Sequence, residues 1–105
     1  MTKTLVEQYV SDHSHMRLFQ QELAIYEVTE LIESAMADMG VSRSDLAAKL
    51  GQSKSWITQL LDGEKNKTIR TVADVFAVLG LEFCSFHRPI QVGSKRAPVP
   101  KLPGD

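Results

Sequence analysis

The chain has 105 residues and a formal net charge of −1, with about 43% apolar and 24% charged residues. These values are typical of one small domain with short extensions. No apolar run approaches the ~20 residues of a membrane span, and the first ten residues lack the pattern of a signal peptide. A single cysteine, Cys84, excludes an internal disulfide. We therefore expect a cytoplasmic protein without a membrane segment.

The charge is distributed unevenly along the chain. Residues 1–42 carry two basic and seven acidic side chains, whereas residues 43–71 carry six basic and three acidic ones. A phosphate backbone responds to the local field rather than to the total charge, so the central segment is compatible with a nucleic-acid partner. By itself, this local excess is equally compatible with an ordinary solvated surface.

The first predicted element is a long amphipathic helix over residues 14–39, a segment without glycine or proline. Its apolar side chains recur at helical spacing, and its acidic side chains occupy the other side. Gly40 is expected to end this helix. Residues 1–13 have only a weak apolar pattern and are expected to be loosely ordered or to form a short helix. The apolar stripe consists of Ile25, Val28, Ile32, Ala35 and Met39.

Three shorter helices are predicted to follow with very short joints. Ser42 caps the first, with Asp45 in a capping-box position, and Gly51 ends it. Ser53 caps a second helix that ends near Leu61, before Asp62-Gly63. Thr68 caps a third that runs to Gly80. The expected buried residues are Leu46, Ala47 and Leu50 in the first of these helices and Ile69, Val72, Ala73, Phe76 and Leu79 in the last.

Residues 81–90 have a different pattern, rich in aromatic residues and ending near Pro89. In it, one set of side chains alternates with another: Leu81, Phe83, Ser85 and His87 with Glu82, Cys84, Phe86 and Arg88. This alternation predicts a short strand, and a lone strand needs a partner. The same strand of another copy is the simplest partner, so we expect a homodimer formed through Leu81, Phe83 and Phe86. Residues 91–105 contain three prolines and are expected to be disordered.

The predicted fold is therefore all-α. It is a compact four- to five-helix bundle with a helix-turn-helix, a short C-terminal strand and a disordered tail. The expected divisions are an N-terminal extension, a helical domain, a dimerisation strand and a tail, at residues 1–13, 14–80, 81–90 and 91–105.

The helix at residues 54–61 is predicted to have one apolar and one polar face. At 100° per residue, its four apolar side chains fall within one arc of about 140°. Lys54, Ser55, Thr58 and Gln59 fall on the opposite side. Amide, hydroxyl and ammonium groups suit the donors and acceptors on base edges, and no acidic residue lies between Lys49 and Asp62. An exposed face without a specific role is the alternative.

Residues 25–80 resemble the Xre family of helix-turn-helix proteins, which includes the lambdoid phage repressors and Cro. The resemblance depends on the small residue Ala47, on Gly51, on the apolar Ile57 and Leu60, and on the Asp62-Gly63 stop. In that family the second helix of the motif enters the major groove. The long acidic leading segment and the C-terminal strand depart from the shortest members.

The resemblance implies a role for individual residues. Lys54, Ser55 and Gln59 would occupy base-reading positions, and Thr58 is a further candidate for a base contact. Candidate phosphate contacts lie near the helix N-termini and in the loop before the last helix. They are Arg43, Gln52, Ser53, Lys65, Asn66, Lys67 and Thr68. Trp56 is expected to be part of the core or to lie against the sugar-phosphate edge.

The implied function is that of a sequence-specific transcriptional regulator, such as a repressor, bound as a dimer to a pseudo-palindromic DNA operator. An antitoxin that represses its own operon and also binds a toxin protein is the alternative. A zinc site formed by His13, His15, Cys84 and His87 is conceivable, but nothing in the sequence brings the two pairs together. We expect neither a metal nor a cofactor. Without a phosphate loop or a nucleophile motif, we also expect no enzyme activity.

Overall fold

The computed structural model describes residues 5–90, and their side chains from Asp12 onward. This part of the chain contains four α-helices and no strand. They are α1 (Leu5–Met39), α2 (Arg43–Leu50), α3 (Lys54–Leu60) and α4 (Ile69–Val78). The coarse prediction of an all-α protein is confirmed for these residues. The predicted disordered tail lies outside them.

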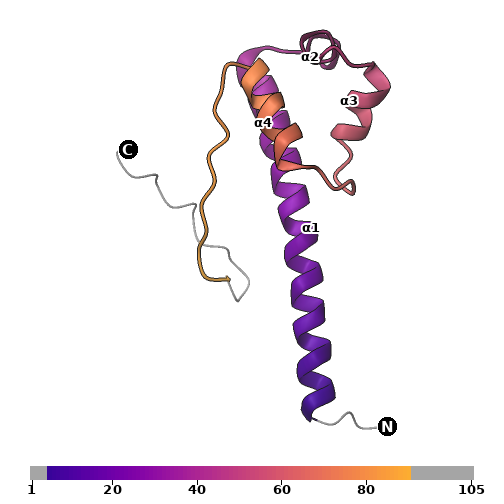
Figure 1. Ribbon diagram of the computed structural model, residues 1–105, viewed down its shortest axis with the longest axis vertical. Coiled ribbons are helices and arrows are strands. Elements are labelled where there is room, and N and C mark those ends of the chain that lie inside the picture. The colour runs from indigo at the N-terminus through magenta and orange to yellow at the C-terminus, as the bar shows by residue number, and fades with distance from the viewer. Residues whose placement is uncertain (1–4, 91–105) are drawn as a thin grey trace.

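The long helix α1 has the three short helices at one of its ends only. The three short helices gather at the C-terminal end of α1, and the N-terminal part of α1 projects away from them (Figure 1). Helix α2 contacts α3 and α4, and α4 packs on α1. The long helix begins at Leu5, so it runs through the boundary that was predicted between residues 13 and 14.

One hydrophobic core joins the four helices. Its largest fully buried side chains are Ile32 of α1, Leu46 of α2, Ile57 of α3 and Val75 of α4. Each helix therefore contributes one of them. The predicted stripe of α4 is wrong at Ile69, which is 77% exposed, and at Ala73, which is also exposed. The buried face is instead formed by Val72, Val75, Phe76 and Leu79, so Ile69 and Ala73 lie to one side of it. Met39, predicted in the stripe of α1, is also exposed.

Local side-chain and glycine signals fix the helix ends. Ser42 and Asp45 form the predicted capping box, since each side chain accepts a hydrogen bond from the other residue's backbone N–H at 3.1 Å. At the end of α2, the N–H of Gly51 donates to the carbonyl of Ala48 and that of Gln52 to Ala47. Gly51 takes a φ of +66°, which this reversal requires. Ser53, the N-cap of α3, follows Gly51 after only Gln52, so the joint between α2 and α3 is short.

The strand predicted for residues 81–90 is not found in the described part of the chain. These residues run back beside α1 without regular backbone pairing (Figure 1). Phe83 is half-buried and stacks on Phe76 of α4, with ring centroids 5.5 Å apart and planes at 16°. The aromatic pattern that suggested a strand is explained, at Phe83, by packing against the core of the same chain.

Replacing Gly51 with alanine should destabilise the protein by about 1–2 kcal/mol, because an L side chain is strained at positive φ. An added Cβ would meet no atom within 4 Å there, so the cost is purely conformational. Denaturant unfolding followed by circular dichroism measures it. Gly63→Ala is the control: Gly63 does not have a positive φ, and a Cβ there also meets open space. Equal stability of the two variants would contradict this explanation.

Candidate functional site

Helix α3 presents two chemically different faces. Ile57, Leu60 and Leu61 are buried in the core, and Trp56 packs against it while half-exposed. The remaining four side chains of the helix region are exposed, and they are those predicted to contact bases: Lys54, Ser55, Thr58 and Gln59. The predicted division into an apolar and a polar arc is therefore confirmed.

The polar face has free hydrogen-bonding capacity. Within residues 5–90, the side chains of Lys54, Ser55 and Gln59 make no hydrogen bond or ion pair with the rest of the chain. The Thr58 hydroxyl donates to the carbonyl of Lys54 at 3.1 Å, which leaves its lone pairs as acceptors. The Ser53 hydroxyl is already used, since it accepts from the N–H of Trp56 at 3.0 Å. A ligand would thus meet unoccupied amide, hydroxyl and ammonium groups.

A shallow hollow of about 200 Å³ joins α3 to the loop before α4. Trp56 and Gln59 line it from α3, and Asn66, Lys67 and Thr68 line it from the loop. The structure therefore brings a predicted base contact next to three predicted phosphate contacts. Thr68 also caps α4, because its hydroxyl accepts from the N–H of Thr71 at 3.1 Å.

Lys67 has a structural role in that loop. Its ammonium group donates to the carbonyl of Asp62 at 3.1 Å and to the carbonyl of Lys65 at 3.0 Å. Burial lowers the pKa of the Lys67 ammonium, and the charge of Asp62 opposes this shift. Only one N–H of this group is left for an external phosphate. Lys65, by contrast, has an exposed side chain with no partner in the described residues.

The remaining predicted phosphate contacts lie at the N-terminus of α2 and in the joint between α2 and α3. A guanidinium nitrogen of Arg43 lies 3.8 Å from a carboxylate oxygen of Glu33 on α1, and both side chains are well exposed. Such a pair contributes at most about 1 kcal/mol, so Arg43 is readily released to a stronger anionic partner. Gln52 and Ser53, in the joint between α2 and α3, are also exposed.

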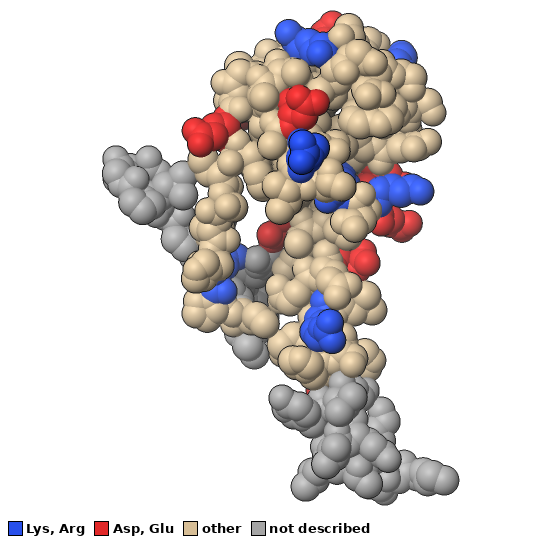
Figure 2. All heavy atoms as spheres, in the orientation of Figure 1, with Lys and Arg blue, Asp and Glu red and all other residues tan. Residues whose placement is uncertain are grey.

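The charged groups are interspersed on the surface. On the face shown in Figure 2, Lys and Arg side chains lie apart, with acidic and uncharged side chains between them. Lys and Arg side chains therefore form no continuous basic patch on that face.

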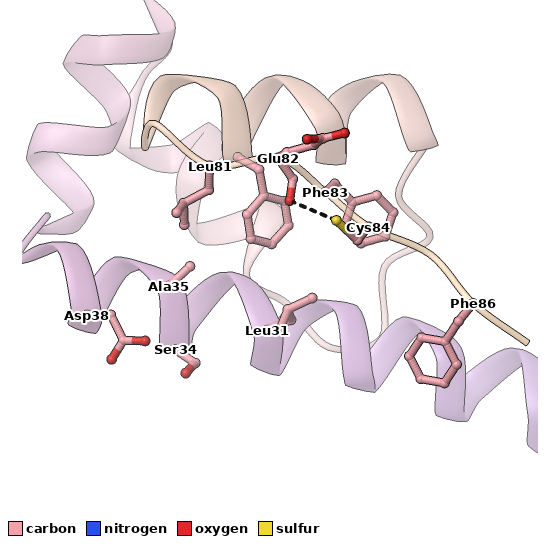
Figure 3. Close-up of a pocket in the computed structure, with 10 residues that line it drawn as sticks. Leu31, Ser34, Ala35, Asp38, Leu81, Glu82, Phe83, Cys84 and Phe86 are labelled. Atoms are coloured by element: carbon pink, nitrogen blue, oxygen red, sulfur yellow. Dashed lines mark hydrogen bonds between the residues drawn. The ribbon is translucent and has the colours of Figure 1, made fainter. Parts of the chain in front are cut away.

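The residues predicted to form a dimer lie in a different part of the molecule. Leu81, Phe83 and Phe86 line a hollow of about 400 Å³ with Leu31 and Ala35 of α1. Figure 3 shows these side chains above one face of α1, with the Cys84 thiol 3.8 Å from the Glu82 carbonyl. Of the three predicted dimer residues, Phe83 is half-buried against its own chain, whereas Leu81 is 38% and Phe86 49% exposed.

Two further features were sought among residues 5–90, a cluster of metal ligands and a membrane-spanning helix. No three His, Cys, Asp or Glu side chains there lie close enough together to hold a metal ion. None of its helices combines the length and apolarity needed to cross a bilayer.

Asp62 was predicted only to end the preceding helix, but it also shapes the loop that follows. Its carboxylate accepts a hydrogen bond from the N–H of Glu64 at 2.9 Å, and its carbonyl accepts one from Lys67. Both bonds shape the loop beside Gln59 and Asn66. The Asp62-Gly63 dipeptide was the sequence signal for this role, because an Asp side chain in a turn commonly accepts a hydrogen bond from the backbone N–H two residues later.

Comparison with known proteins returned no match: no family model, no curated protein and no solved structure is similar to the chain. The inference of function therefore depends on the residues and geometry of the chain itself.

Replacing Lys67 with alanine should lower the free energy of unfolding by about 1 kcal/mol, because two carbonyls lose a charged donor. Urea unfolding at pH 7 measures this change without any ligand. Lys65→Ala is the matched control and should leave the stability within about 0.5 kcal/mol of the original protein. If the two variants are equally stable, the two hydrogen bonds of Lys67 contribute nothing to the loop.

Asp45 should make the protein lose stability in acid. Hydrogen bonds from the backbone and side chain of Ser42 lower the pKa of its carboxyl below the ordinary value of 3.8. Because the folded pKa is the lower one, the contribution is complete above the unfolded pKa and is lost as the pH falls through the folded pKa. Asp45→Asn should therefore destabilise the protein at pH 6 and have a smaller effect at pH 2. Thermal melts across this range test it, with Asp38→Asn as a control on an exposed carboxyl.

Proposed function

We propose that this protein is a sequence-specific DNA-binding transcriptional regulator that reads the major groove with α3. In this proposal α2 and α3 form a helix-turn-helix like that of the Xre family. Binding at an operator would act by occupancy, blocking or redirecting transcription.

The observation that carries the proposal is the outward face of α3. Its side chains are short, polar and exposed, and three of them have no partner within the described residues. A glutamine can donate to and accept from an adenine, a lysine can donate to guanine acceptors, and a serine suits either base. No carboxylate stands on α3 to repel a phosphate backbone.

The opposite face of α3 supports the same proposal. Ile57 is fully buried, so the helix is held by the core rather than by its own exposed groups. A reading helix must keep its orientation when it enters a groove, since base contacts depend on hydrogen-bond geometry. The loop residues Asn66 and Thr68 stand next to Gln59 across the hollow. There they could contact the backbone that flanks the base under Gln59.

The first experiment is selection of bound duplexes from a random pool, followed by sequencing. The proposal expects enrichment of one motif, and a two-fold symmetric motif would also give the half-site spacing. Recovery of unenriched pool DNA at low salt would overturn sequence-specific binding.

The second experiment tests Gln59 directly. Gln59→Ala should weaken binding to the selected site by about 1–3 kcal/mol and relax the preference at one base pair. Competition binding against a set of single-base variants of the site measures both effects. Gln21→Ala, at an exposed glutamine on α1, is the matched control and should bind as the original protein does. A preference left intact by Gln59→Ala would remove this face from the interface.

A further inference from the structure

Trp56 lies at the border between the two faces of α3. At 100° per residue, its side chain is about 60° around the helix axis from Gln59 and about 40° from the buried Leu60. The indole packs against the core on one side and stays half-exposed on the other. The two positions expected for Trp56 from the sequence, in the core and at the edge of the DNA backbone, are therefore compatible.

The indole N–H of Trp56 has no partner within the protein. Among the described residues no group accepts a hydrogen bond from it, and no buried side-chain nitrogen or oxygen there lacks a partner. This N–H is therefore not buried and opens to solvent. An indole N–H can only donate, so it is completed only by an external acceptor. A side chain with an apolar body and one polar edge suits the border of an interface.

Hydrogen-bond donors surround the hollow of about 200 Å³ that Trp56 lines. The side-chain amides of Gln59 and Asn66 make no hydrogen bond among the described residues, and Lys67 has one N–H left. No Asp or Glu of the described residues lines the hollow. An anionic oxygen would meet several donors there and no carboxylate. The polar side chains that line it with Trp56 are Gln59, Asn66, Lys67, Thr68 and Thr71.

We propose that Trp56 is a further DNA contact of this protein, and that its indole N–H donates to a phosphate oxygen next to the base under Gln59. The inference rests on the proposed function and adds to it a residue outside the polar face of α3. Roughly half to two-thirds of all protein–DNA hydrogen bonds go to phosphate and sugar, so such a contact is of the common kind. A charged oxygen is also the stronger acceptor for a donor-only group.

The place of Trp56 favours a phosphate over a base edge. In the proposed function, Lys54, Ser55, Thr58 and Gln59 face the bases, and Trp56 lies beyond the Gln59 end of this arc. On that side it shares the hollow with Asn66 and Thr68, which are predicted phosphate contacts. Base edges also present donors, which an indole N–H cannot use, whereas phosphate oxygens only accept.

The first test removes the N–H and keeps the shape of the side chain. Trp56 is the only tryptophan of the chain, so growth of a tryptophan auxotroph on benzothienylalanine replaces it alone and puts sulfur in place of the N–H. Binding of this protein to the selected duplex should be about 10-fold weaker. Single-base variants of the site should lose affinity equally, because a phosphate contact carries no sequence information.

Two substitutions accompany the isostere. Trp56→Phe also lacks the N–H and should bind at least as weakly. Tyr26→Phe is the matched control, because it removes one polar hydrogen from an aromatic residue on α1 that is 56% exposed, and it should bind as the original protein does. Thermal melts without DNA separate loss of the contact from loss of the fold. Unchanged affinity of the isostere, or a relaxed preference at one base pair, would overturn the phosphate contact.

The fluorescence of Trp56 gives an independent readout. Quenching by acrylamide should fall by about half or more when the protein is saturated with the selected duplex, since the DNA shields the indole edge. Inorganic phosphate at the same concentration of phosphate groups should leave the quenching unchanged. Quenching that the duplex does not alter, or that free phosphate reduces equally, contradicts the proposed contact.

The outcomes for the contact and for the proposed function are distinguishable. If the original protein selects a motif and the isostere binds it equally well, the function stands and Trp56 is removed from the interface. If the original protein selects no motif, the proposed function fails and the contact fails with it.

Discussion

The structure depends on one core to which every helix contributes a fully buried side chain. Ile32, Leu46, Ile57 and Val75 come from four different helices. Helix α3 has only seven residues and would not persist alone in water. Burial of Ile57, with Leu60 and Leu61 beside it, therefore both forms this helix and fixes its rotation. The exposure of Lys54, Ser55, Thr58 and Gln59 is a consequence of that burial.

Hydrogen bonds between polar groups hold the loop between α3 and α4, next to the helix that the core anchors. The Asp62 carboxylate accepts a hydrogen bond from the N–H of Glu64. The Lys67 ammonium donates to the carbonyls of Asp62 and Lys65. An ammonium group used in this way holds Asn66 and Thr68 beside Gln59. The proposed interface thus has a helix anchored in the core on one side and a loop with internal hydrogen bonds on the other. Its exposed cations, Lys54 and Lys65, remain available to phosphate.

Helix α1 is packed differently along its length. Its C-terminal third completes the core, whereas its N-terminal half projects away from the three short helices (Figure 1) and exposes Met16, Phe19 and Tyr26. The sequence predicted the core face of α1 through Ile25 and Ile32, and the exposed side chains on its other side were not predicted.

The sequence by itself determined where the short helices begin and end. Ser42, Ser53, Thr68 and Gly51 act on backbone groups a few residues away, so their effect needs no distant contact. It also determined the two faces of α3. Tertiary structure decided the rest, because those choices depend on distant partners. Phe83 stacks on Phe76 instead of forming a strand, and Val75 rather than Ile69 is buried. Whether an apolar side chain is buried depends on which neighbours the folded chain places around it.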